Sequence, residues 1–360
     1  MDKFGAWIFY VGLPVTQVYH LLCGSIFFNA ADDDAQGIDK IANYVLAPTH
    51  YLFCGSRVKN EVGLDLSPRF SYDEHFLVKT ATSFVALPLS AGAGALLKAA
   101  AYLMPETRKN HHKILDRVKL IAVDAKSDYY RSLGMKINDY SRASFANTPT
   151  IVRGPIDHDK MKKEQAALKE IVTLLHAHKI PFWVDCGTLL GTYRHGGVIP
   201  WDWDLDIAIL APDFDNVKSV LSGLDPEKCV VQDWSGRERP KSYLKVYVKG
   251  TPTLIDIYHF DIDPKKKVLR SIFSNEGSPF LPESMKIRER RYCVETPFDL
   301  VFPLKRAFFE GIEVPVPGKM KEYLQLRYGE DLRPAKVYNP DTGNYENDLS
   351  HPYWKIPHAH

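Results

Sequence analysis

Three aspartates spaced two residues apart, Asp202, Asp204 and Asp206, constrain this chain more than any other feature of its sequence. On a β-strand the side chains at i and i+2 project from the same face, so Asp204 and Asp206 would lie side by side. Their negative charges repel one another unless a cation binds between them. Carboxylate oxygens are the ligands that Mg²⁺ prefers, and Mn²⁺ accepts the same ligands. The sequence therefore predicts a Mg²⁺ (or Mn²⁺) site.

The segment before the aspartates suggests what the metal would bind. Magnesium held by one or two carboxylates usually completes its shell with water and substrate phosphates. The apolar residues 180–184 are followed by Asp185, Cys186, Gly187 and Thr188, which predicts a strand that turns into a short helix near Thr188. Backbone N–H groups at a helix start bind phosphate oxygens, and glycine allows their close approach. Gly187 and Thr188 are therefore predicted phosphate-binding residues.

Asp256 is the predicted third carboxylate of the site. It lies in residues 253–260, a β-branched and aromatic run typical of a buried strand. Residues 243–249 and the turn at 250–252 predict that this strand forms a hairpin with the one before it. A carboxylate inside such a strand is costly to bury unless it is paired or metal-bound. The expected metal ligands are Asp204, Asp206 and Asp256. The alternative is that the Asp-x-Asp pattern lies on a solvated strand edge or loop.

Together these residues resemble the LicD/fukutin family, which has the nucleotidyltransferase superfold. The positions that carry the resemblance are 187–191, Arg194, Gly196, Gly197 and 199–206. Residues 299–329 match more loosely, so the resemblance covers residues 157–351. It implies an α/β (α+β) fold, in which a nucleotidyltransferase-like mixed sheet carries the carboxylates and helices flank it.

The resemblance also implies an activity. Members of this family transfer a phospho-alcohol group, phosphocholine or a polyol phosphate, from a CDP-linked donor to a hydroxyl of a glycan or glycolipid. The attack builds negative charge on phosphate oxygens, which a bound metal stabilises. Asp256 or Asp202 is expected to deprotonate the acceptor hydroxyl, and the sequence leaves that choice open. Arg194 and Lys245 are expected to contact phosphate; the alternative for each is an ordinary surface charge.

Two other functions remain open, and the first of them would use the same carboxylates. A nucleotidyltransferase would move the nucleoside monophosphate to a protein or small molecule, and the product identifies which half of the donor is transferred. A non-catalytic membrane scaffold would keep the fold and not need the metal. His195, inside the motif, is expected to shape the loop rather than to exchange protons.

Composition excludes several other classes of protein. The net charge is +2, from 46 basic and 44 acidic residues, and there is no sustained basic stripe, so nucleic acid is not an expected partner. Five cysteines without a Cys-x-x-Cys pair argue against a disulfide framework and favour a reducing compartment. Cys186 is expected to be a packing residue.

The first part of the chain differs in composition from the rest. Residues 4–31 and 80–97 are uncharged and apolar, and basic residues from Lys98 to Lys119 follow the second run. We expect two domains: residues 1–150, helical and membrane-associated, and residues 151–360, catalytic. The catalytic domain is expected in the cytoplasm, or in the Golgi lumen if the protein is eukaryotic. The alternative is that these runs are ordinary buried helices.

Three further segments complete the prediction. Residues 157–179 have the spacing of an amphipathic helix. Residues 261–267 are predicted as a loop. The aromatic tail, residues 337–360, is expected to close over the core, with stacking on a base or sugar ring as the alternative.

Overall fold

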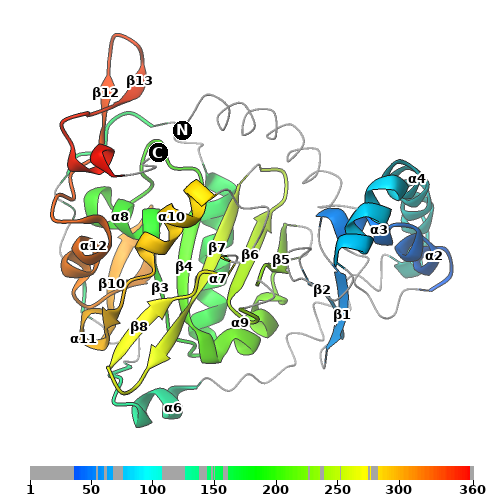
Figure 1. Cartoon of the computed structure of the whole chain (residues 1–360), viewed down its shortest axis with the longest axis horizontal. Helices are drawn as coiled ribbons and strands as arrows, with labels where there is room; N and C mark the ends of the chain where they lie inside the picture. Colours follow the sequence, from blue (N-terminus) through cyan, green and yellow to red (C-terminus); the bar gives the residue numbers. More distant parts are fainter. Residues whose placement is uncertain are drawn as a thin grey trace.

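The computed structural model describes residues 36–53, 56–60, 63–67, 76–107, 126–137, 144–146, 149, 151–156, 161–225, 228–235, 239–251, 253–274, 276 and 283–356. Within this part of the chain, a mixed sheet is flanked by helices, and a helical segment comes earlier in the sequence (Figure 1). The predicted α/β fold class is therefore confirmed.

The central sheet has seven strands, and its main path runs in the order β3-β4-β7-β6-β5. β8 pairs with the far half of β7, and β9 pairs with β8. Among these pairs β4 and β7 are parallel, whereas the others are antiparallel. The strands are β3 (Phe182–Val184), β4 (Leu205–Leu210), β5 (Cys229–Asp233), β6 (Tyr243–Val248), β7 (Leu254–Asp263), β8 (Val268–Ser271) and β9 (Thr296–Pro297).

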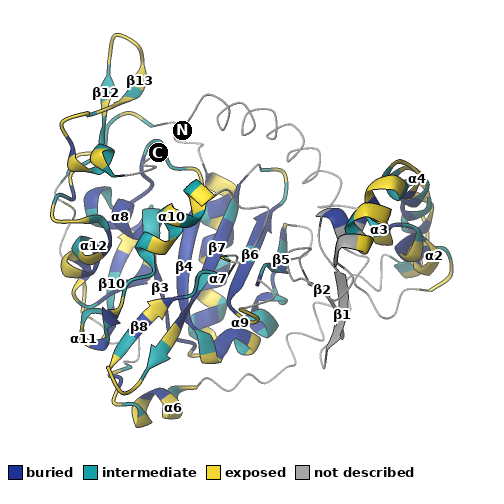
Figure 2. Cartoon of the chain, viewed as in Figure 1, coloured by how far each residue is buried: buried dark blue, intermediate teal, exposed yellow. Residues whose placement is uncertain are grey.

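Helices cover the sheet because its strands are apolar on both faces. All six residues of β4 are buried, which requires packing on each side. α7 and α9 pack against each other, and α7 packs against β6 and β7. α8 contacts β4 and α12 contacts α8. Figure 2 shows the resulting buried sheet. The helices are α7 (Lys162–Ala177), α8 (Cys186–His195), α9 (Phe214–Leu221), α10 (Glu283–Tyr292), α11 (Phe298–Val301) and α12 (Met320–Tyr328), with a short 3-10 turn, η4 (Ala211–Asp213), before α9. A two-stranded sheet, β10 (Lys305–Phe309) and β11 (Ile312–Val316), lies beside β3.

Local predictions hold where the pattern was periodic. The helix expected at 157–179 is α7, whose buried residues Leu168, Ile171, Val172 and Leu175 follow the helical spacing. The predicted hairpin is β6 and β7, which pair antiparallel.

The prediction of a loop at 261–267 was wrong in its first half. β7 continues to Asp263, because its last three residues pair with β8. The remaining turn is closed by the Asp263 carboxylate, which accepts hydrogen bonds from the backbone N–H groups of Lys265 and Lys266 at 3.0 Å each.

The core extends to the N-terminal side of the boundary expected at residue 151. Tyr130, in α6 (Ser127–Ser132), and Met135 belong to the same cluster of buried residues as the central sheet. The Tyr130 hydroxyl donates a hydrogen bond of 2.5 Å to the buried carboxylate of Asp213. The folded unit that contains the central sheet therefore includes α6.

The N-terminal helices α2 (Gly37–Val45) and α3 (Ala47–Phe53) pack on α4 (Phe76–Tyr102). Thr49 and Ser90 share a hydrogen bond of 2.8 Å. Lys98, expected as part of a basic flank, is instead buried in an ion pair with Asp39. The strands β1 (Ser56–Asn60) and β2 (Gly63–Ser67) form a separate hairpin. The apolar run 4–31 and the other basic residues of the flank, between 108 and 119, lie outside the described residues.

Among the residues that the structure describes, one helix is long and apolar enough to cross a membrane. It covers Thr80–Tyr102 with a mean hydropathy of 1.5, and 22% of its most apolar window is buried. Its exposed side chains include Phe84, Val85, Leu89 and Leu96. An ordinary core helix would bury most of this surface. The helix therefore gives weak support to membrane association.

The described part of the aromatic tail does not close over the core as expected. Residues 336–339 and 344–347 form a two-stranded hairpin, β12 (Lys336–Asn339) and β13 (Asn344–Asn347), followed by the 3-10 turn η5 (Pro352–Lys355). None of the hairpin residues is fully buried. Tyr338 and Tyr345 pair across the hairpin on one face, where their rings contact each other and Tyr345 also contacts Trp201.

Candidate active site

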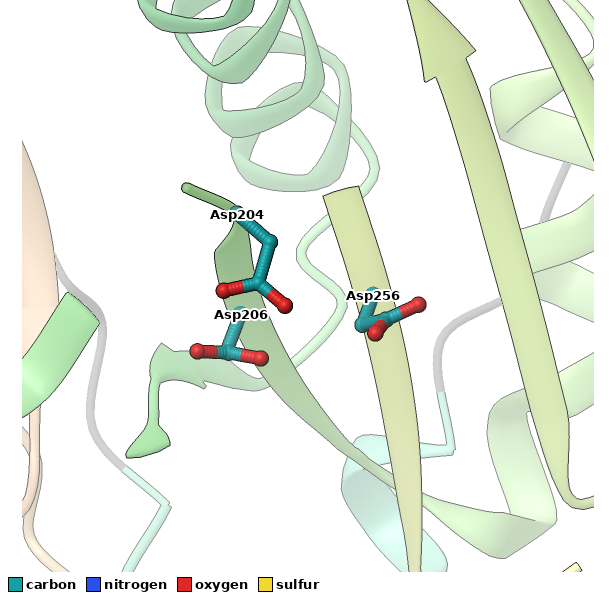
Figure 3. Close-up of side chains that lie close together, drawn as sticks. All are labelled: Asp204, Asp206 and Asp256. Atoms are coloured by element: carbon teal, nitrogen blue, oxygen red, sulfur yellow. The ribbon is translucent and has the colours of Figure 1, made fainter. Parts of the chain in front are cut away.

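Asp204, Asp206 and Asp256 meet at the parallel pair of strands. Asp204 directly precedes β4, Asp206 lies in β4 and Asp256 lies in β7. The register places Asp206 opposite Asp256. One oxygen of each carboxylate lies within 4.8 Å of the others (Figure 3). The structure thus brings together the three residues that the sequence suggested.

Burial raises the free-energy cost of keeping these three carboxylates ionised without a cation between them. Burial, together with the charges of Asp202 and Asp256, raises the pKa of Asp204 to about 8. Burial also raises the pKa of Asp206 well above its ordinary value, and Asp204 and Asp256 add to the shift. Either protons or a divalent cation would relieve the repulsion.

Lys245 faces this group as expected. It lies opposite Asp256 in the β6–β7 register, and its Nζ is 3.0 Å from Asp256 Oδ1. The ammonium also lies 5.0 Å from the Tyr243 ring centre and 5.5 Å from that of Trp234. The side chains of Lys245 and Asp256 are 16% and 7% exposed, so solvent screens the pair only weakly.

The start of α8 is tied to the acidic strand. The Thr188 hydroxyl accepts a hydrogen bond of 2.7 Å from the backbone N–H of Asp206. A Cβ added at Gly187 would lie 2.2 Å from a carboxylate oxygen of Asp202, so a larger residue there would require the Asp202 side chain to shift. Thr188 therefore holds the strand, and Gly187 leaves room for Asp202.

Asp202 lies at the edge of the group. Its negative charge helps to raise the pKa of Asp204, and its Oδ1 accepts a hydrogen bond from the backbone N–H of Trp203 at 3.1 Å. Its side chain is partly exposed, and it is not one of the three clustered ligands. This position fits a group that exchanges protons with a substrate better than a metal ligand.

Arg194 is not placed as expected. Its guanidinium is buried and donates hydrogen bonds to the backbone oxygens of Leu332, at 2.7 Å, and Arg333, at 2.6 Å. Gly187 and Arg194 are about 10 Å apart along the helix axis, at 1.5 Å per residue. Arg194 therefore anchors the segment after α12, and the phosphate role predicted for it is not the one that this geometry favours.

The other reactive side chains of the motif have structural environments. His195 Nδ1 lies 3.1 Å from the backbone oxygen of Ile151, which agrees with a loop-shaping role. Burial raises the pKa of the Cys186 thiol well above its ordinary value, and Asp185 adds to the shift. A protonated thiol is a weak nucleophile, so the expectation that Cys186 is a packing residue is consistent with its environment.

Sequence reasoning missed a buried ion pair below the site. Asp185 directly precedes α8, and its carboxylate accepts hydrogen bonds of 2.9 Å from Arg327 and from the Tyr323 hydroxyl. All three residues are buried. The backbone N–H of Asp185 donates to the backbone oxygen of Asp206 at 3.1 Å. Asp185 therefore connects α12 with β4, the strand that carries Asp206.

Two tyrosines next to Asp256 were also missed. Tyr258, two residues further along β7, donates a long hydrogen bond of 3.4 Å to Asp256 Oδ2. The Tyr243 ring stacks on that of Tyr258 at 5.2 Å. The period-2 rule places Tyr258 on the same face as Asp256, so this contact could have been predicted.

Comparison with known proteins agrees with this geometry. Residues 179–319 match the nucleotidyltransferase-domain family described as LicD/FKTN/FKRP. The resemblance to the LicD/fukutin family is thus confirmed for this segment, which contains all the carboxylates described above.

The individual relatives have low sequence identity to this chain. The chain is 29% identical over 174 residues to an uncharacterized protein of Rickettsia prowazekii, covering 48% of this chain and 56% of that protein. It is 26% identical over 177 residues to the ribitol 5-phosphate transferase FKRP of mouse and to that of human, covering 48% of this chain and 32% of each relative. The alignments therefore span about half or less of these relatives.

Proposed function

We propose that this protein is a metal-dependent transferase. It moves a phospho-alcohol group, such as ribitol phosphate or phosphocholine, from a CDP-linked donor to a hydroxyl of a glycan or glycolipid. The observation that carries the proposal is the group of carboxylate oxygens of Asp204, Asp206 and Asp256, within 4.8 Å of one another. The family match and the similarity to ribitol 5-phosphate transferases support the class of reaction.

The residues present fit a divalent cation. All three ligands are carboxylates, the donors that Mg²⁺ and Mn²⁺ take, and two of them are buried where an uncompensated charge is costly. Asp204, Asp206 and Asp256 would hold the ion. When bound, it would neutralise charge that develops on the phosphate oxygens during transfer.

The chain's own groups would perform the remaining steps. The acceptor oxygen forms a bond to the phosphorus of the phospho-alcohol group, while the bond from that phosphorus to the bridging oxygen breaks and CMP leaves. We assign the hydroxyl proton to Asp202, because Asp256 already pairs with Lys245. Lys245 stabilises negative charge at the Asp256 end of the site.

The test is incubation of the full chain with a panel of CDP-linked alcohols, Mg²⁺ and glycan acceptors. Release of CMP with labelled alcohol phosphate on the acceptor is the expected result. Release of free alcohol phosphate, with CMP on the acceptor, would instead identify a nucleotidyltransferase. Absence of both products with every donor would contradict the proposal.

Metal binding should stabilise the protein more at high pH. Since the pKa of Asp204 is raised from 3.8 to about 8, the folded state holds a proton there that the unfolded state has lost between these values. Without metal, stability should therefore fall as pH rises through this window. Mg²⁺ replaces the proton, so we expect it to raise the melting temperature more at about pH 8.5 than at about pH 6. Thermal melts with Mg²⁺ or with chelator measure this; equal shifts at both pH values would argue against it.

We also propose that α4 associates with a membrane, with the catalytic domain on the cytoplasmic side. After alkaline carbonate extraction, we expect the full chain to remain with the membrane pellet. Replacing the exposed Val85, Leu89 and Leu96 by serine should shift protein to the supernatant. The substitutions reduce the apolar surface area that α4 can bury in the membrane. Leu349→Ser, at an exposed site outside α4, is the control. Wild-type protein found wholly in the supernatant would exclude the association.

A further inference from the structure

A lysine of the C-terminal hairpin lies between two indole rings. Lys336, the first residue of β12, has its Nζ 5.9 Å from the ring centre of Trp201 and 6.0 Å from that of Trp354. The side chain is half-buried. In the part of the chain that the structure describes, no carboxylate lies within 4.0 Å of this ammonium, so its charge has no ion-pair partner there.

The position of Lys336 is fixed by the contacts of the hairpin. The Tyr345 hydroxyl donates a hydrogen bond of 2.8 Å to the backbone oxygen of Pro155, and its ring lies 5.1 Å from that of Trp201. The Trp354 indole N–H donates to the backbone oxygen of Ala335 at 2.8 Å. Both indoles beside the ammonium are therefore held in place, which favours a pre-organised arrangement over a mobile surface lysine.

This cluster borders the acidic site. Trp201 directly precedes Asp202 in the chain, and Asp202 is the charged group that acts on Lys336. Lys245 pairs with Asp256, at the other end of the acidic residues. A substrate that reaches the carboxylates would thus meet one ammonium near Asp202 and another beside Asp256.

We propose that Lys336, Trp201 and Trp354 form a substrate subsite for a sugar or polyol phosphate. A lysine ammonium is a compact point charge with three N–H donors and binds phosphate, whereas indole faces stack on the ring or carbon chain of a sugar. The inference rests on the proposed function and adds a contact to a part of the substrate that the carboxylates do not bind. Both halves of the donor, the nucleotide and the phospho-alcohol, contain a phosphate next to a sugar or polyol, so either could occupy the subsite.

The location of the subsite agrees with a role in selecting the substrate. Lys336 and Trp354 lie after residue 319, outside the segment that matches the family domain. The carboxylates lie inside that segment. The matched domain would thus contribute the metal-binding residues and Trp201, and the segment that follows it would contribute Lys336 and Trp354.

The experiment is equilibrium binding, which does not require turnover. The full chain with Mg²⁺ is titrated with CDP and, separately, with ribitol 5-phosphate, and affinity is measured by calorimetry. We expect Lys336→Met to weaken binding of at least one probe about tenfold or more, the loss typical of a charged hydrogen bond. Lys336→Arg should retain most of the affinity. Lys355→Met removes an exposed lysine of the same tail and is the matched control.

The pattern of loss identifies the source. A loss for CDP alone assigns the subsite to the nucleotide, and a loss for ribitol 5-phosphate alone assigns it to the phospho-alcohol. The proposal is overturned if wild-type protein binds neither probe, if Lys336→Met binds both as wild type does, or if Lys355→Met loses as much. Because the readout is binding, the subsite and the reaction can fail separately. Affinity that depends on Lys336 without any transfer would reject the reaction and keep the subsite. Transfer that Lys336→Met leaves unchanged would keep the reaction and reject the subsite.

Discussion

Asp206→Asn is expected to lower the transfer rate by about a thousandfold or more, equivalent to about 4 kcal/mol of transition-state stabilisation. Asn is nearly isosteric with Asp but carries no charge, so one of the three ligands of the metal loses most of its affinity. Asp206 is the most informative choice because it is buried near the start of β4 and lies opposite Asp256. Asp204→Asn should also lower the transfer rate. Steady-state kinetics with a donor identified from the panel measure the rates of both variants.

The same variant should not be less stable than wild type in the absence of metal. Burial and the neighbouring carboxylates raise the pKa of Asp206, so removing its charge relieves repulsion in the folded state. Loss of activity with an unchanged or higher melting temperature in chelator would separate a functional role from a structural one. Asp261→Asn, at an exposed position further along β7, is the control and should leave the rate unchanged. Wild-type turnover by Asp206→Asn would contradict the proposed chemistry.

Arg327→Met is expected to lower the free energy of unfolding by about 3–5 kcal/mol. Its guanidinium is buried and pairs with Asp185 at 2.9 Å, with exposed fractions of 2% and 1% for the two side chains. Removing the arginine leaves the Asp185 carboxylate charged and buried with only the Tyr323 hydroxyl as a side-chain donor. Urea unfolding followed by circular dichroism measures the loss.

A matched arginine on the surface supplies the control for this prediction. Arg333 pairs with Asp331 at 2.7 Å, but its side chain is 64% exposed, so Arg333→Met should change stability by less than about 1 kcal/mol. Asp185→Asn combined with Arg327→Met should recover part of the loss, because no buried charge then remains unpaired. If Arg327→Met unfolds at the same urea concentration as Arg333→Met, the buried pair has no special importance for stability.

The sequence predicted the parts of the site that depend on local pattern. Alternation along 204–206 and 253–260 determines which side chains share a face, and the Gly-Thr-Pro turn at 250–252 determines the hairpin. The structure brings the three carboxylates together for these reasons. Lys245 follows from the same register, since it pairs with Asp256 across the hairpin.

What the sequence did not predict depends on contacts between distant segments. Arg194 is close to Gly187 in the motif, but α8 separates the two along its axis and turns Arg194 toward Leu332. The pairing of Asp185 with Arg327 joins α8 to α12, and no spacing rule relates these positions. The tail was expected to pack on the core because it is aromatic, yet its rings contact one another and Trp201 instead.

The parallel pairing of β4 with β7 has a consequence for synthesis of the protein. Asp204 and Asp206 are translated before β5 and β6, whereas Asp256 is translated after them. Asp256 reaches the other two only when β7 pairs between β4 and β6. A nascent chain that ends before residue 254 thus has an incomplete set of ligands and should hold divalent ions weakly. On the proposed function, the ion would therefore bind the completed sheet and not its precursors, and cellular magnesium would stabilise the finished fold selectively.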